Sequence, residues 1–138
     1  MVDQNERNRL LAEEFRARGG WVDEPNFKDA TLLLLTNIGR KSGEIYVSPM
    51  VYLADGERYV VFATHQGADV DPDWCKNLLA AGRATIEVGT EKFEVIADAT
   101  HGTEREELWR RQIEAHPTFA DYREKTSRDI PVIALTRA

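Results

Sequence analysis

The chain has 138 residues, and its 18 lysines and arginines against 24 aspartates and glutamates give a net charge of −6. An acidic chain offers no general surface for nucleic acid, so any basic site must be local. The charged first thirty residues are unlike a signal peptide, no apolar run is long enough to span a bilayer, and a single cysteine excludes an internal disulfide. We expect a cytoplasmic protein of one domain, with residues 1–27 as an N-terminal helix and connector and residues 28–138 as the main body.

The first expected element is a helix over residues 4–18, where a few apolar residues lie among charged ones and Gly19-Gly20 follows as a stop. Such a helix packs on a domain, and the alternatives are weak contact with a membrane surface or contact with a bound substrate. The aromatic connector Trp21-Val22 and Pro25–Phe27 is expected to cover the open end of a sheet.

The apolar run 32–35 is followed by the turn Gly39-Arg40-Lys41-Ser42-Gly43 and then by a second strand-like run that reaches Met50. This pattern predicts a hairpin. Glycine lets the backbone approach a ligand closely, while arginine offers a planar fork and lysine a point charge for phosphate or carboxylate. We therefore expect the turn to meet an anion, and the alternative is a solvated turn with no role in binding.

The rest of the chain predicts further hairpins and helices in alternation. In order, these are a continuation of the second run through 51–53, the turn Asp55-Gly56, a strand over 58–64, a polar loop over 65–70, and a helix with Asp71 as N-cap and Pro72 at its first position that stops before Gly82. They go on with strands over 84–88 and 93–97 joined at Gly89-Thr90, a helix opened by a capping box of Thr103 and Glu106 and ending near His116, a helical piece from Pro117 to about Thr126, and a strand over 131–135. Short turns between successive strands predict an antiparallel sheet of about six strands in an α+β fold, mainly β, which closure into a small barrel would protect from edge pairing.

Several kinds of chemistry are excluded by the motifs that the sequence lacks. The three histidines lie far apart and have no HExxH or CxxC pattern, so no metal site is predicted. There is no GxSxG elbow, P-loop or GxGxxG fingerprint. Cys75 is interpreted as structural, with a reactive thiolate at a helix N-terminus as the alternative. The basic turn, the polar loop before a helix and the aromatic residues remain, and together they suit a large anionic cofactor.

A set of motifs occurs in one order along the chain. They are Gly39-Arg40-Lys41-Ser42-Gly43, Ser48-Pro49-Met50, Asp55-Gly56, Pro72-Asp73-Trp74 with Asn77, Glu104-Arg105, Leu108-Trp109, Asp121-Tyr122 and Arg128-Asp129-Ile130-Pro131-Val132. Over roughly residues 28–138 this set resembles the deazaflavin-dependent nitroreductases of actinobacteria, also described as F420H2-dependent quinone reductases. The resemblance implies a split β-barrel related to the flavin-binding pyridoxamine oxidases, with flanking helices and with coenzyme F420 in the place of FMN.

The resemblance also implies roles for individual residues. Those for the cofactor are Arg40, Lys41 and Ser42 on its acidic tail, Val47, Ser48, Pro49, Met50, Ala63 and Thr64 along the deazaflavin ring, and Asp73, Trp74 and Asn77 over the remainder. For the substrate, Val51, Phe119 and Tyr122 are expected to line the space above the ring. Trp74 and Tyr122 also fit a plain role in the core.

The sequence departs from the family pattern at several of these places. Tyr46 stands where the family usually has arginine, Thr64 where it has serine, and His65-Gln66 where it has lysine-glycine. Losing two cations removes contacts worth about 1.5–3 kcal/mol each when well formed, which predicts weaker F420 binding. His116 and Phe119 replace tyrosines of the nitroimidazole-reducing members, so the resemblance does not decide whether nitroimidazole prodrugs are reduced.

The resemblance implies an F420H2-dependent oxidoreductase that passes a hydride to a small-molecule acceptor, namely a quinone, an enone or a nitroaromatic. Tyr122 is the first choice for proton donor or oxyanion hydrogen bond and Thr64 the second. His65 would replace a lost tail contact rather than act as a base, and Tyr46 is also expected at the cofactor. The alternatives are that Tyr122 only packs against substrate, that the chain is a non-catalytic F420 carrier or an FMN-binding reductase of the same fold, or that it is a protein-interaction module. We expect a monomer or homodimer.

Overall fold

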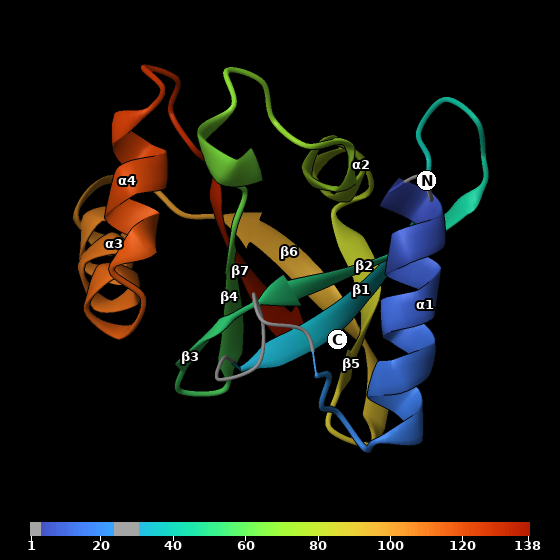
Figure 1. Cartoon of the computed structure of the whole chain (residues 1–138). Coiled ribbons are helices and arrows are strands. Elements are labelled where there is room, and N and C mark those ends of the chain that lie inside the picture. The colour runs from blue at the N-terminus through green and yellow to red at the C-terminus, as the bar shows by residue number, and fades with distance from the viewer. Residues whose placement is uncertain (1–3, 24–30) are drawn as a thin grey trace.

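The computed structural model of the protein describes residues 4–23 and 31–138, and Figure 1 shows a curled sheet with helices around it. Its elements are α1 (Gln4–Ala17), β1 (Leu32–Ile38), β2 (Ile45–Val51), β3 (Leu53–Asp55), β4 (Arg58–Phe62), the short 3₁₀ helix η1 (His65–Gly67), α2 (Asp73–Ala81), β5 (Arg83–Val88), β6 (Glu91–Ala99), α3 (Gly102–Ala115), α4 (Thr118–Glu124) and β7 (Val132–Arg137). Pro25–Phe27 and the expected boundary at residues 27 and 28 lie outside the described residues.

The seven strands form one antiparallel sheet in the order β2-β1-β5-β6-β7-β4-β3. The two edge strands, β2 and β3, are consecutive in the chain and are separated only by Tyr52. Because one residue joins opposite edges, the sheet must curl on itself into a split barrel. Tyr52 fixes this corner, since its N–H donates to the carbonyl of Thr31 at 3.1 Å and its carbonyl accepts from the Thr31 hydroxyl at 2.8 Å. The expectation of about six strands was one too few, because the chain crosses between edges at Tyr52.

The apolar run at the start of β1 is explained by cover on both faces of the sheet. Leu33 and Leu35 point into the barrel, whereas Leu32 and Leu34 pack against the buried side of α1. A strand buried on both faces reads as a continuous apolar run rather than as an alternating one. The apolar side of α1 is therefore used inside the protein, and no helix among the described residues is long and apolar enough to cross a membrane.

The opposite part of the sheet is covered by α3 and α4 (Figure 1). Val60 and Phe62 of β4 pack outward against a cluster that includes Trp109 of α3, while Val61 points into the barrel. The rings of Phe62 and Trp109 meet edge to face with centroids 5.1 Å apart. Alternate residues of one strand thus serve two separate cores.

Two predicted helix starts were wrong. α2 begins at Asp73 with Pro72 as its N-cap, because the carboxylate of Asp71 binds the guanidinium of Arg128 at 2.6 Å instead of capping the helix. The predicted end is confirmed: Gly82 takes φ +73° and its N–H donates to the carbonyl of Leu78.

The capping box predicted for α3 does not form. The helix begins at Gly102 with His101 as N-cap and without a side-chain capping bond. Glu106 instead accepts hydrogen bonds from Arg123 of α4 at 2.6 and 2.8 Å. A tertiary ion pair therefore takes the carboxylate that the local pattern assigns to the cap.

Candidate functional site

A cavity of about 790 Å³ opens between the β1–β2 turn, β2, the start of α2 and the first turns of α1. Its lining brings together ten of the residues that the sequence predicts at a cofactor: Arg40, Lys41, Ser42, Tyr46, Ser48, Pro49, His65, Asp73, Trp74 and Asn77. Asn8, Gly39 and Pro72 complete it. The volume is within the range of small-molecule and cofactor sites, which bury most of a ligand in a cleft.

The turn between β1 and β2 is closed by its own backbone. The N–H of Gly39 donates to the carbonyl of Glu44 at 2.8 Å, and that of Gly43, at φ +73°, donates to the carbonyl of Gly39 at 2.9 Å. A Cβ on Gly39 would lie 2.6 Å from the Ser42 hydroxyl and 2.9 Å from the ring of Tyr46. A side chain at position 39 would therefore displace the Ser42 hydroxyl or the Tyr46 ring from the cavity wall.

Asn77 of α2 fixes the position of the Arg40 side chain. Its Nη1 donates to Oδ1 of Asn77 at 2.8 Å, and its backbone N–H donates to the same oxygen at 3.0 Å. The carboxylate of Asp73 lies 3.9 Å from Nη1 and is 84% exposed, so this ion pair is weak. The amide of Asn77 is buried, and it fixes the guanidinium at the cavity wall without neutralising its charge.

Tyr46, at the position where the resemblance implies arginine, closes a small polar network. Its hydroxyl lies 3.2 Å from the Ser42 hydroxyl and donates to the Glu44 carboxylate at 3.1 Å. The hydroxyl of Ser42 in turn accepts from the N–H of Glu44 at 3.2 Å. Position 46 therefore stiffens the turn instead of adding a third cation beside Arg40 and Lys41.

The N-terminus of α2 faces the cavity through Pro72, Asp73 and Trp74. Cys75 and Lys76 donate their N–H groups to the carbonyl of Pro72, and the N–H groups before them, at Asp73 and Trp74, belong to the first turn, which has no acceptor within the helix. Such a terminus favours an anion. Trp74 is half-buried, and its carbonyl accepts from Nδ2 of Asn37 at 2.9 Å, which ties α2 to β1.

The segment between β4 and α2 forms another wall. His65 takes a positive φ of +49°, which is a strained conformation for a residue with a side chain. Its Nδ1 lies 3.1 Å from the carbonyl of Val70, which favours a proton on Nδ1 and leaves Nε2 for a ligand. The expected polar loop is therefore a tight structure that presents an imidazole to the cavity.

Four residues expected at the cofactor lie elsewhere than on the lining. Val47 packs on the side of β2 that faces α1, and Met50 and Ala63 belong to the core inside the barrel. Thr64 is buried at the end of β4, and its carbonyl accepts from Arg128. Alternation along β2 separates Ser48, which lines the cavity, from its neighbour Val47.

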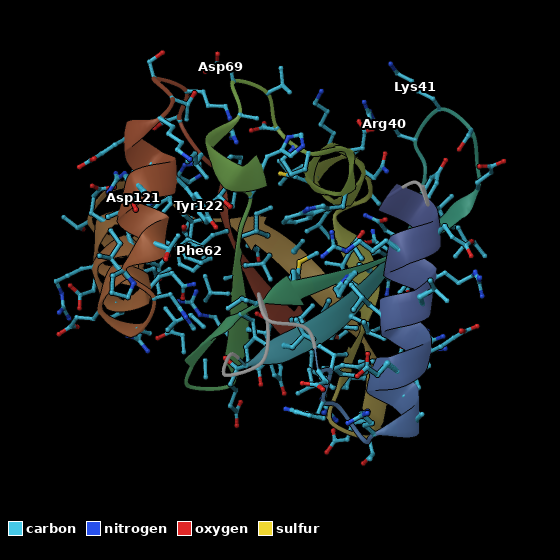
Figure 2. All side chains as sticks on the ribbon, in the orientation of Figure 1. Arg40, Lys41, Phe62, Asp69, Asp121 and Tyr122 are labelled. Atoms are coloured by element: carbon cyan, nitrogen blue, oxygen red, sulfur yellow. The ribbon has the colours of Figure 1, made fainter. Side chains whose placement is uncertain are left out.

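The residues expected at the substrate also lie apart from the lining. Figure 2 shows Tyr122 and Phe62 near α4, across the molecule from Arg40 and Lys41. Tyr122 packs edge to face against Phe119 with ring centroids 5.4 Å apart. The ring of Phe119 packs in turn on that of Phe62, with centroids 6.1 Å apart. Val51 is half-buried and pairs with Leu32 across the hairpin. The roles assigned to Val51, Phe119 and Tyr122 stay predictions.

Sequence reasoning missed Asn8, Pro72 and the largely covered arginine Arg128. Asn8 comes to the cavity only because α1 packs along β2, and nothing in its local sequence signals this. Pro72 was assigned to the helix rather than to the site. Arg128 was read as part of a motif, and its contacts with the segment before α2 depend on the tertiary fold.

Cys75 lies beside the cavity but faces the core. It is fully buried, and burial together with the negative charge of Asp71 raises the pKa of its thiol to about 12. The helix N-terminus does not overcome these effects, so the thiol stays protonated at neutral pH. Among the described residues, no group of three or more His, Cys, Asp or Glu side chains could hold a metal ion.

Solved structures show what this architecture is similar to. The "F420-H2 Dependent Reductase (FDR-A)" superposes with a TM-score of 0.69 at 30% identity, over 76% of this chain and 93% of that one. A structure described as a domain-swapped dimer gives a TM-score of 0.72 at 27% identity over 94% and 95%. The heme storage protein HutZ of Vibrio cholerae shares the fold alone, at 16% identity and a TM-score of 0.60 over 95% and 90%.

Sequence comparisons agree with the structural ones. The F420H(2)-dependent quinone reductase Rv1261c of Mycobacterium tuberculosis is 33% identical over 108 residues, which are 76% of this chain and 72% of the relative. Rv3178 of the same organism is 34% identical over 108 residues, or 78% and 91%. The family model for F420H(2)-dependent quinone reductases matches residues 7–137, so it includes most of α1 as well as the sheet. The chain belongs to the F420H2-dependent quinone reductase family.

Proposed function

We propose that the cavity beside the basic turn holds coenzyme F420 and that the protein passes reducing equivalents from F420H2 to a quinone, an enone or a nitroaromatic. Family membership makes the chain an F420H2-dependent reductase with F420 as its cofactor. The observation that supports the location is the convergence of Arg40, Lys41 and the N-terminus of α2 on one cavity of about 790 Å³. These are donors for phosphate and carboxylate groups, and the cavity is large enough for a cofactor with a long tail.

Each part of the lining has a role in this proposal. Arg40, held by Asn77, and Lys41 would bind the anionic tail, and the Ser42 hydroxyl would add a neutral hydrogen bond. Trp74 and Pro49 are apolar surfaces that would cover the flat ring and exclude water from it.

When bound, the reduced deazaflavin supplies a hydride of nicotinamide type. The protein then has to hold the acceptor and provide a hydrogen bond where negative charge develops on its oxygen. The hydroxyl of Tyr122 is our first candidate for that bond and for the proton, with Thr64 second. The acceptor itself can take its proton from water if neither hydroxyl reaches it.

A direct comparison of cofactors tests the proposal. Purified protein is titrated with F420 and with FMN while the fluorescence of each cofactor is followed. We expect F420 to bind at least about ten-fold more tightly, because two cations and a helix N-terminus suit a tail with more anionic groups than the single phosphate of FMN. Tighter binding of FMN would place the protein among the flavin-binding members of the fold.

A non-catalytic F420 carrier is the alternative against which family membership argues, and the separation of Tyr122 and Phe119 from the cavity lining is the observation for which it is tested. Single-turnover reoxidation of protein-bound F420H2 by menadione, cyclohexenone or a nitroarene separates the two. Rapid reoxidation by one of these acceptors supports the reductase and identifies the acceptor class. Protection of F420H2 from all three supports the carrier.

The relative described as a domain-swapped dimer supports a homodimer for this chain as well. Light scattering on a sizing column, at several protein concentrations, would distinguish a dimer from a monomer of 15.7 kDa. The cytoplasmic location stays a prediction.

A further inference from the structure

The cavity wall between β4 and α2 needs support from outside itself. Residues 63–72 contain no regular element longer than η1, and His65 within them takes the strained φ of +49°. A strained residue persists only where its surroundings over-determine the conformation. The bond from His65 to Val70 lies within the segment, so it cannot anchor the segment to the rest of the fold.

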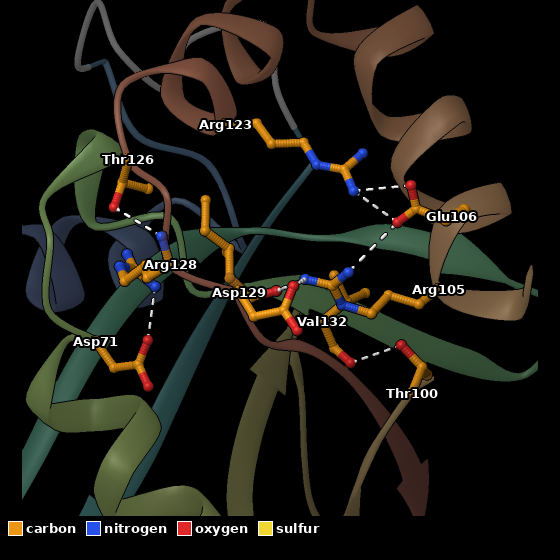
Figure 3. A network of polar contacts seen from close by, with 10 residues as sticks. Asp71, Thr100, Arg105, Glu106, Arg123, Thr126, Arg128, Asp129 and Val132 are labelled. Carbon is orange, nitrogen blue, oxygen red and sulfur yellow. Dashed lines mark hydrogen bonds and ion pairs between the residues drawn. The ribbon is translucent and has the colours of Figure 1, made fainter. Parts of the chain in front are cut away.

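Arg128 supplies such an anchor. Its Nε donates to the carbonyl of Ala68 at 2.7 Å, and its Nη2 donates to the carbonyls of Ala63 at 3.0 Å and Thr64 at 2.8 Å. Its Nη1 donates to the carboxylate of Asp71 at 2.6 Å, as Figure 3 shows. One guanidinium thus holds four points of the segment, on both sides of the strained histidine.

The neighbours of Arg128 reinforce the same segment. The hydroxyl of Thr126 donates to the carboxylate of Asp69 at 2.8 Å and accepts from the N–H of Arg128 at 3.2 Å. Gly67 is packed so closely on α4 that a Cβ would lie 2.7 Å from Cβ of Lys125. The wall is therefore docked on the α4–β7 connection, and only its first residue, Ala63, also packs in the barrel interior.

The charge of Arg128 is used within this network. Its side chain is 13% exposed, its carboxylate partner is Asp71, and it is not among the residues that line the cavity. It would not contact a bound tail directly. A guanidinium whose donors are distributed over three carbonyls and one carboxylate acts on the shape of the wall.

We propose that Arg128 is a positioning residue for the cofactor cavity: its guanidinium fixes the segment 63–72, so that His65 and Pro72 stand in the conformation that the cofactor meets. The ligand-binding part of this inference rests on the proposed function, because it assumes that the cavity takes F420. The ordering of the segment 63–72 by Arg128 does not depend on that assumption.

Arg105 provides a matched control. Its side chain is 14% exposed, and it binds the carbonyl of Ile130 and the carboxylates of Glu106 and Asp129, none of which lines the cavity or belongs to the segment 63–72. Figure 3 shows it bound to the same connection that carries Arg128. Lysine at either position keeps the charge but loses the fork that binds several acceptors at once. Arg128→Lys and Arg105→Lys should therefore both lower the melting temperature. Because both variants lose stability, a difference between them reports the particular role of Arg128.

Two readouts separate positioning from stability. In the protein without cofactor, amide hydrogen exchange over residues 63–72 should rise about ten-fold or more in Arg128→Lys and stay near wild type in Arg105→Lys. The Kd for F420, measured by fluorescence, should rise about ten-fold in Arg128→Lys and change less than about two-fold in Arg105→Lys. If Arg128→Lys does not fold, Asp71→Asn, which leaves the three carbonyl bonds, should show smaller changes in the same direction.

Equal exchange over residues 63–72 in the two arginine variants would overturn the inference, as would an unchanged Kd in Arg128→Lys. If wild-type protein fails to bind F420, the proposed function is wrong. The exchange comparison then still decides whether Arg128 orders the wall.

Discussion

The amide oxygen of Asn77 accepts two hydrogen bonds from Arg40, one from Nη1 at 2.8 Å and one from the backbone N–H at 3.0 Å. A single buried side chain of α2 thus fixes both the turn and its guanidinium. Asn77→Ala should raise the Kd for F420 about ten-fold, because Arg40 loses the partner that pre-orders it. Lys76→Ala, one residue away but exposed and off the lining, is the control for losing a side chain on α2. A Kd that rises no more in Asn77→Ala than in the control would contradict this role.

Lys41 is the cleaner test of charge at the turn, since Arg40 also stabilises the fold through Asn77. Lys41 is exposed, so Lys41→Ala should change the free energy of unfolding by less than about 0.5 kcal/mol. It should weaken F420 binding several-fold at low salt and less so at high salt, because screening reduces the contact that is removed. Titrations at two ionic strengths, with Lys92→Ala on β6 as a charge-matched control, measure this. If the two variants bind F420 with the same Kd at both ionic strengths, Lys41 has no role in binding and the turn is a solvated loop.

The Tyr122→Phe variant tests whether the Tyr122 hydroxyl supplies the hydrogen bond and the proton to the acceptor. If the hydroxyl donates to the acceptor, kcat should fall about 10- to 100-fold with the Kd for F420 preserved. The ring contact with Phe119 would survive the change, so loss of packing cannot produce the effect. Tyr59→Phe, whose ring packs on Tyr52 and Phe93, is the control. Unchanged turnover with a quinone, an enone and a nitroarene would show that the hydroxyl has no catalytic role.

Glu87 links stability to pH. Its carboxylate binds Arg16 of α1 through two hydrogen bonds of 2.8 and 2.9 Å, and these bonds lower the pKa of Glu87. A carboxyl with a folded-state pKa below its unfolded value stabilises the protein above the unfolded value and loses that contribution as pH falls through the folded value. Glu87→Gln should cost about 1–2 kcal/mol at pH 7, and urea unfolding should show the difference from wild type shrinking toward about pH 3. A difference that is the same at both pH values would exclude this linkage.

Cys75 should resist alkylation in the folded protein. Its thiol is buried and its pKa is raised to about 12, so very little thiolate exists at pH 8. Iodoacetamide should modify it only after unfolding in denaturant, as mass spectrometry would show. Rapid modification of the native protein would mean that the thiol is exposed and activated after all.

The sequence by itself determined the features that depend on neighbours along the chain. The basic turn with its glycines, the hairpins at Asp55-Gly56 and Gly89-Thr90, and the helix end at Gly82 are local patterns, and each forms where predicted. The motif order also identified the family, because spaced motifs along the chain need no three-dimensional information. The antiparallel sheet followed from the short connections between strands.

Only the tertiary structure decided which side chains serve the cavity. Asp71 and Glu106 fit local capping patterns, yet each is taken by an arginine from a distant segment, since a charge-assisted pair outcompetes a cap when the fold brings the partner near. Asn8 reaches the cavity through the packing of α1, and Tyr122 lies away from its lining because α4 covers the outer face of the sheet. The two faces of each strand lead to different cores, so which neighbours share a wall depends on how the sheet curls at Tyr52.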